Sequence, residues 1–228
     1  MSVSKNLYKA LNPYFKSLGF RKHGKCYYKI ENDIAFCFTP EFVSYVRLWC
    51  YILPLYVPTE FRHLDYGTHI EHVHRELQNT ILTYGEITVK EAEAWLNKMA
   101  PVIENEVLPF FKSISSPKLL LQYCSSPSNR SKYMFVSYGN PKLFRLQSYT
   151  ALYADEKEIA QKAIESFRES VLNCKKLLPS YIEKYVAESR KMEKMLLLPD
   201  EERAQQFQEI CGKTLYNCFT PKKRNAKK

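Results

Sequence analysis

The chain has 228 residues, of which 45% are apolar and 14% aromatic, and its formal net charge is +10. This composition excludes global disorder, and the length suits one large domain or two small ones. The longest apolar run, residues 48–57, is too short to span a bilayer, and the seven cysteines have an odd count and no C-x-x-C spacing. The N-terminus also lacks the apolar core of a signal peptide. We therefore expect a cytoplasmic protein with reduced thiols, no membrane contact and no cofactor.

The positive charge is concentrated at the two ends of the chain. Residues 1–30 contain seven Lys or Arg and no acid, and residues 222–228 contain five more bases and no acid. The remainder, with 22 bases against 24 acids, is close to neutral. A localised patch of this kind attracts an anionic partner, whereas a dispersed charge mainly affects solubility.

The first predicted element is an amphipathic helix over about residues 4–18. Leu7, Leu11 and Phe15 recur at helical spacing, and Pro13 is expected to bend the helix or delay its start. Gly19 suits the left-handed position that ends a helix.

A β-hairpin is predicted next, because the apolar period changes to two. Its strands are expected at residues 26–30 and 34–38, joined by a turn at 31–33. In the first strand, Lys25, Tyr27 and Lys29 are expected on one face and Cys26, Tyr28 and Ile30 on the other. Residues 45–53 are apolar on both faces, as in a covered central strand.

The middle of the chain is less regular. Residues 59–84 match no single element, but Thr88 and Glu91 form a capping-box pattern that begins a helix. Pro101 and Pro109 are expected to break or kink this helix, and a short helix is predicted at 117–124.

The remaining chain is predicted to be mostly helical. Residues 125–132 have the composition of a linker, and about four helices with short loops follow. The predicted fold is therefore α+β: a small antiparallel sheet with an N-terminal helix and covering helices. The expected parts are an α+β domain at 1–124, a helical region at 133–221 and a basic tail at 222–228.

Two runs resemble the bacterial domain-of-unknown-function family numbered 4304. The first contains Leu11-Asn12-Pro13, Leu18-Gly19-Phe20-Arg21-Lys22, Gly24 and Tyr27-Tyr28; the second contains residues 106–112 and 116–121. The resemblance covers about residues 4–124. It implies a helix stop, a hairpin and a helix pair, and it brings no known activity or functional residues.

The basic first half of the hairpin is the candidate partner-binding surface: Arg21, Lys22, Lys25, Tyr27 and Lys29. Cations beside a ring that can stack would suit nucleic acid, and the same charges would suit an acidic protein. A third interpretation is structural, with lysines filling a solvent face and protecting an edge strand.

A histidine-rich segment is the candidate metal site, with His63, His69, His72 and His74 within twelve residues. On a strand His72 and His74 would share a face, whereas on a helix His69 and His72 would be neighbours. The spacing matches no known metal motif, and a polar surface segment explains it equally.

No nucleophile motif, phosphate-binding glycine loop or paired acidic motif is present, so the sequence favours a non-enzymatic protein. We expect an interaction protein, of an accessory or immunity type, that uses its basic N-terminal helix and hairpin. Direct nucleic-acid binding is the alternative, and a metal-dependent enzyme using residues 63–74 is a more distant one. Nothing in the sequence predicts the oligomeric state.

Overall fold

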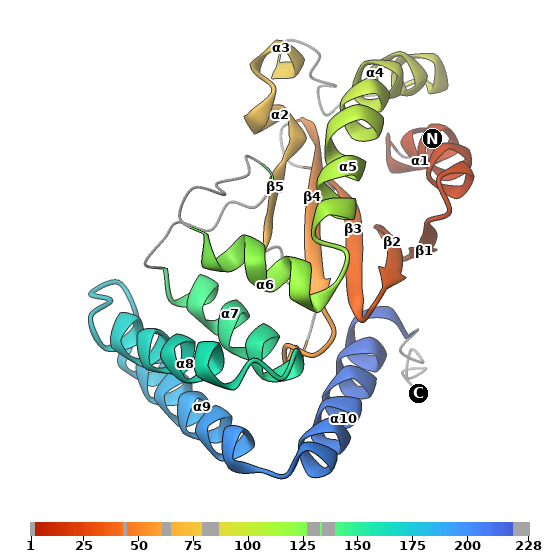
Figure 1. Ribbon diagram of the computed structural model, residues 1–228. Coiled ribbons are helices and arrows are strands. Elements are labelled where there is room, and N and C mark those ends of the chain that lie inside the picture. The colour runs from red at the N-terminus through yellow and green to blue at the C-terminus, as the bar shows by residue number, and fades with distance from the viewer. Residues whose placement is uncertain are drawn as a thin grey trace, which may run out of the picture.

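The computed structural model describes residues 3–42, 45–60, 65–78, 87–126, 133 and 140–220. They form a five-stranded antiparallel sheet in sequential order, surrounded by helices (Figure 1), which confirms the predicted α+β class. The strands are β1 (Arg21–His23), β2 (Cys26–Glu31), β3 (Ile34–Phe42), β4 (Val46–Pro54) and β5 (Gly67–His69).

Helices precede and follow this sheet. They are α1 (Val3–Ser17), α2 (Ile70–Val73), α3 (Arg75–Gln78), α4 (Val89–Val102), the π-helical segment η1 (Ile103–Val107), α5 (Leu108–Ser113), α6 (Pro117–Ser125), α7 (Pro141–Tyr153), α8 (Lys157–Leu172), α9 (Pro179–Leu197) and α10 (Asp200–Phe219). The predicted four-helix C-terminal region corresponds to α7–α10. Within the described residues, none of the helices has the length and apolarity needed to cross a membrane.

The end of α1 shows why the chain turns into the sheet at Gly19. This glycine has φ +82°, its N–H donates to Lys16 O, and the N–H of Phe20 donates to Phe15 O. The pair of bonds is a Schellman motif, which places glycine where other residues are strained. Phe20 is thereby directed into the core beside Phe15.

The hairpin of β2 and β3 forms as predicted, and a shorter strand precedes it. Asn32 and Asp33 have φ of 47° and 60°, so they make the two-residue turn that suits the twist of paired strands. The alternation of residues 26–38 did not reveal β1, which is three residues long. His23 pairs with Cys26 across a second tight turn, where Gly24 has φ +59°.

The prolines at 101 and 109 interrupt the helix pattern without ending the helix. Thr88 and Glu91 form the predicted capping box, and α4, η1 and α5 then follow without a gap. In the π-helical turn the N–H of Leu108 donates to Ile103 O, five residues back, directly before Pro109, which has no N–H to donate.

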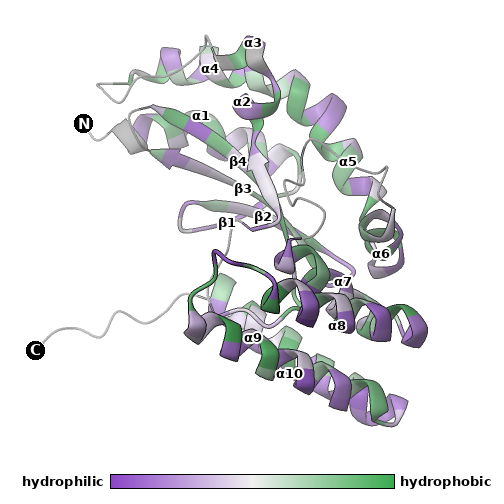
Figure 2. Ribbon diagram, turned by 90° about the vertical axis from the view of Figure 1, so that its left-hand side faces the viewer, coloured by the Kyte–Doolittle hydropathy of each residue, from purple (hydrophilic) through white to green (hydrophobic). Residues whose placement is uncertain are grey.

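Both faces of the sheet are covered. Phe36, Phe38 and Ile52 belong to the main core with α1, α4 and α5, whereas Cys37 and Tyr51 belong to a second cluster with Cys218 and Phe219 at the end of α10. Figure 2 shows α1 and α4 on one side of the sheet and α7 to α10 on the other.

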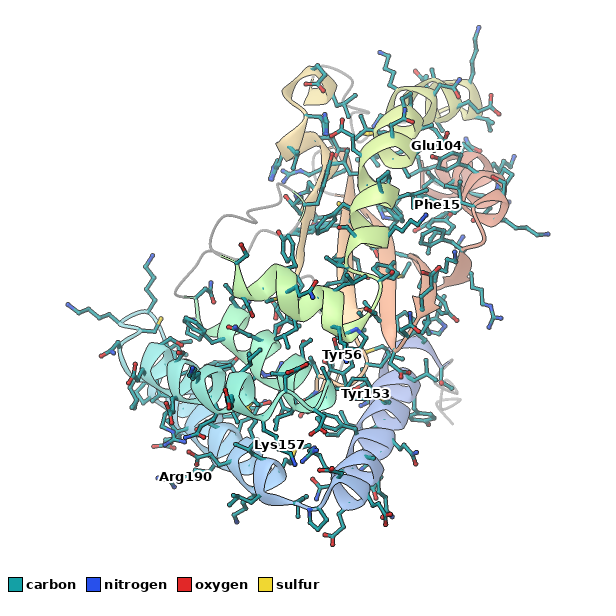
Figure 3. All side chains as sticks on the ribbon, in the orientation of Figure 1. Phe15, Tyr56, Glu104, Tyr153, Lys157 and Arg190 are labelled. Carbon is teal, nitrogen blue, oxygen red and sulfur yellow. The ribbon has the colours of Figure 1, made fainter. Side chains whose placement is uncertain are left out.

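The main core continues from the sheet into the helical region. Tyr56, just after β4, stacks on Tyr153 at the end of α7, with the ring centroids 4.4 Å apart (Figure 3). Buried residues of α7 and α8, such as Leu146 and Phe167, belong to the same cluster as Phe15 of α1. The predicted boundary between residues 124 and 133 therefore falls between two packed helices, α6 and α7.

Candidate interaction surface

The exposed side of α1 carries a single line of lysines. Lys5, Lys9 and Lys16 are all exposed. At 3.6 residues per turn they fall within about 40° of one another around the helix axis, over about 16 Å of its length. The opposite side is buried, and Figure 3 shows Phe15 pointing from α1 towards the sheet. The amphipathic pattern that builds the core therefore also aligns the positive charges.

Asn12 joins the strand β1 to this line of lysines. Its Oδ1 atom accepts a hydrogen bond from Lys22 Nζ at 2.9 Å and another from Tyr27 Oη at 2.7 Å. Lys22 Nζ also lies 3.8 Å from the centroid of the Tyr8 ring, and partial burial lowers the pKa of Lys22. Lys22 is thus held against α1 and adds a fourth cation to the same surface.

The position of Tyr27 corrects the predicted stacking site. Only 1% of this residue is exposed, and its ring stacks on Phe15 with centroids 4.4 Å apart. The expected alternation failed here because both faces of β2 are covered at its start: Tyr27 faces α1 and Cys26 faces the second core. Tyr27 therefore cannot stack on a base, although it positions Asn12 and thereby Lys22.

The other predicted members lie at the exposed edge of the sheet. Lys25 is exposed in the turn between β1 and β2, and its Nζ atom lies 5.3 Å from the centroid of the Phe42 ring. Arg21 is exposed at the start of β1. It pairs with Tyr28, so its side chain leaves the sheet on the face opposite to α1, whereas Lys22 pairs with Tyr27 on the α1 face. Lys29 pairs with Glu31 at 2.7 Å. Within the described part of the chain, Lys29 is the only one of the seven bases of residues 1–30 that has an ion-pair partner.

We define the basic face as Lys5, Lys9, Lys16, Lys22 and Lys25. Its charges come from three neighbouring elements, α1, β1 and the turn after β1, and no carboxylate among the described residues pairs with them. The basic tail at 222–228 lies outside the described residues.

The histidine segment does not assemble as one site. His69 is buried at the end of β5, where its Nε2 atom lies 2.9 Å from Glu41 Oε2 and its ring contacts Trp49. Burial lowers the pKa of His69 to about 4, so it is neutral at pH 7. His72 is exposed on α2, with its ring centroid 4.7 Å from that of His69.

His74 has a separate set of partners. Its Nδ1 atom bonds Glu76 at 2.8 Å, and its Nε2 atom bonds Tyr133 Oη at 2.8 Å. Tyr133 in turn donates to Glu106. Because both ring nitrogens contact protein groups, neither is available to a metal ion in this arrangement. Among the described residues no group of three or more ligating side chains could hold a metal ion; His63 lies outside them.

The sequence-based site predictions did not include one buried acid, Glu71, or one largely covered base, Arg145. Glu71, 5% exposed, accepts the backbone N–H of Leu48 on both carboxylate oxygens, at 3.1 and 3.2 Å. Arg145 of α7 forms a bidentate pair with Glu188 of α9, with a shortest distance of 2.7 Å. The only sequence signal for Glu71 was its place among the histidines, and Arg145 has none, because a charged residue in a helix is usually exposed.

No family model, no curated protein and no solved structure matches this chain. The resemblance of residues 4–124 to the domain-of-unknown-function family therefore stays a prediction.

Proposed function

We propose that this protein is a non-enzymatic interaction protein that binds an acidic surface of another protein through the basic face. The observation that carries the proposal is the set of five neighbouring cations, three of them aligned along α1, with no carboxylate partner among the described residues. Charges left unpaired on one surface raise association rates with an oppositely charged partner and select against cationic ones. An accessory or immunity-type role fits such binding.

The burial of Tyr27 favours a protein partner over nucleic acid. Single-stranded nucleic acid is held by cations together with exposed rings on which bases stack. On the basic face, the rings of Tyr8 and Phe42 lie under Lys22 and Lys25, and Tyr27 is in the core. The cations remain, and they would support only binding to phosphates without sequence preference.

The test is affinity purification from native lysate with a stripe variant, Lys5→Gln/Lys9→Gln/Lys16→Gln. We expect the unmodified protein to retain a stoichiometric acidic protein that the stripe variant loses. A matched control, Lys162→Gln/Lys175→Gln/Lys184→Gln, removes the same charge from exposed positions of the helical region and should retain it.

Two outcomes would contradict the proposal. A companion that the stripe variant retains as well as the control would show that the basic face is not the contact. Alternatively, double-stranded DNA could bind with an affinity that falls about 10³-fold or more between 50 and 200 mM salt, as expected for several phosphate contacts. Together with the absence of a protein companion, that result would assign the face to nucleic acid.

A further inference from the structure

A cavity that is separate from the basic face lies between the sheet and the C-terminal helical region. Its volume is about 490 Å³, within the range of small-molecule sites. The turn between β2 and β3, the end of α7 and one side of α10 form its walls, and Figure 3 shows Tyr153 at the end of α7 beside α10. The residues of α10 that line it recur at helical spacing from Asp200 to Cys211.

The charges at one end of this cavity neutralise one another. Arg203 is 4% exposed, and its Nη2 atom donates to Asp155 at 2.5 Å and to Asp200 at 2.8 Å. Lys157 also donates to Asp200, at 3.1 Å. The positive charge of Arg203 is therefore already neutralised by these carboxylates and does not favour an anionic ligand.

Asp33 differs from the other acids of the cavity. It lies in the tight turn between β2 and β3, and its Oδ2 atom accepts a hydrogen bond from Tyr153 Oη at 2.6 Å. The phenol is neutral, because burial and the adjacent Asp33 raise the pKa of Tyr153. Across the described ranges Asp33 forms no ion pair, so its half-buried carboxylate faces the cavity without a compensating cation.

The wall beside Asp33 is aromatic and chemically inert. Phe207 meets Tyr153 edge to face, with centroids 5.1 Å apart. Aromatic faces near a carboxylate attract organic cations. Cys211 also lines the cavity, but burial, followed by the charge of Asp33, raises the pKa of its thiol to about 12. A neutral thiol is a poor nucleophile, so the cavity suits reversible binding.

We propose that this cavity binds a small organic cation, a primary ammonium on a short apolar chain. The ammonium pairs with Asp33, and the chain lies against Phe207. This site is independent of the basic face, because it is formed by other elements and has the opposite charge preference.

Calorimetric titration with pentylammonium chloride tests the site, with pentanol and sodium pentanoate as neutral and anionic controls. We expect saturable binding of the ammonium alone. Asp33→Asn should weaken it at least tenfold, because asparagine tolerates the left-handed turn and still accepts the Tyr153 hydrogen bond but carries no charge. Glu158→Gln, an equal charge change on exposed α8, should leave the affinity unchanged.

A second variant tests the location independently of charge. Ala204 lines the cavity but is exposed, so Ala204→Phe should fill the cavity without disturbing the core, and should abolish binding while Asp33 remains. The proposal is overturned if no ammonium binding saturates, if pentanoate binds equally well, or if either cavity variant binds as tightly as the unmodified protein.

Discussion

At the scale of single residues, buried acids and bases give this protein an intrinsic response to pH. Burial raises the pKa of Glu71 to about 7, from 4.5, and lowers that of His69 to about 4, from 6.5. The two residues lie on either side of Ile70, and their effects oppose each other. Protonating Glu71 favours the folded state, whereas protonating His69 favours the unfolded state.

The effect of Glu71 can be isolated by comparison with Glu71→Gln. Since the folded-state pKa is raised, the folded protein binds more protons between about pH 4.5 and 7, and stability is lost as the pH rises through that window. Glutamine keeps an oxygen for the N–H of Leu48 and stays neutral. We expect the variant to be more stable than the unmodified protein at pH 8, by up to about 3 kcal/mol, and to lose that advantage at pH 4.5.

Urea denaturation at both pH values measures this difference, and the contribution of His69 cancels in the comparison. Glu93→Gln, on the exposed side of α4, is the control for a charge change without burial. An advantage of Glu71→Gln that does not vary with pH would contradict the assigned cause.

At the scale of elements, short tight turns and paired charges fix how neighbouring segments meet. The Schellman motif at Gly19 directs the chain from α1 into β1, and Asn12 then ties both β1 and β2 back to α1. In the helical region the corresponding tie is the pair of Arg145 and Glu188, whose side chains are 16% and 14% exposed. Tyr149 donates to the same carboxylate.

The Arg145–Glu188 pair should behave as a buried ion pair. Arg145→Met or Glu188→Met leaves one buried charge without its partner and should each cost about 3–5 kcal/mol of unfolding free energy. The double variant should cost clearly less than the sum, because no uncompensated charge remains. Chemical denaturation of the four proteins measures the coupling.

The exposed pair of Glu209 and Lys213 on α10 serves as the reference. Lys213→Met should cost less than about 1 kcal/mol, since solvent screens such pairs. Strictly additive effects of Arg145→Met and Glu188→Met would show that the two charges do not stabilise each other.

At the scale of the whole molecule, the last helix completes the sheet. Phe219 stacks on Tyr28 with centroids 4.3 Å apart, and Thr214 of α10 donates to Val57 O at 3.4 Å. The N-terminal part therefore buries its second sheet face against residues nearly 200 positions away in sequence.

Removal of α10 should consequently destabilise the sheet as well as the helical region. A chain ending at Leu198 exposes the cluster around Tyr51, so we expect binding of a hydrophobic dye and a broadened, less cooperative thermal transition. A chain ending at Thr220, which removes only Pro221 and the basic tail, should unfold like the full protein. If both truncated chains unfold cooperatively at the same temperature, α10 does not support the sheet.

The sequence by itself determined the elements with local signals. Apolar spacing, the capping box at Thr88 and the turn residues near 31–33 were sufficient for α1, the hairpin and α4, because these depend on neighbours a few residues apart. It also located the excess charge of the N-terminal segment. The short strands β1 and β5 had no such signal, since three residues are too few to show a period.

The tertiary structure decided which side chains are accessible and which charges meet. The alternation of the strand predicted that Tyr27 lies on its exposed face. Because α1 covers that face, the Tyr27 ring is part of the core. Lys22 and Asn12 form a hydrogen bond although they are ten residues apart in the sequence, and Asp33 and Tyr153 do so at a separation of 120 residues. Such contacts depend on the packing of whole elements against one another, and no periodicity within a single segment records that packing.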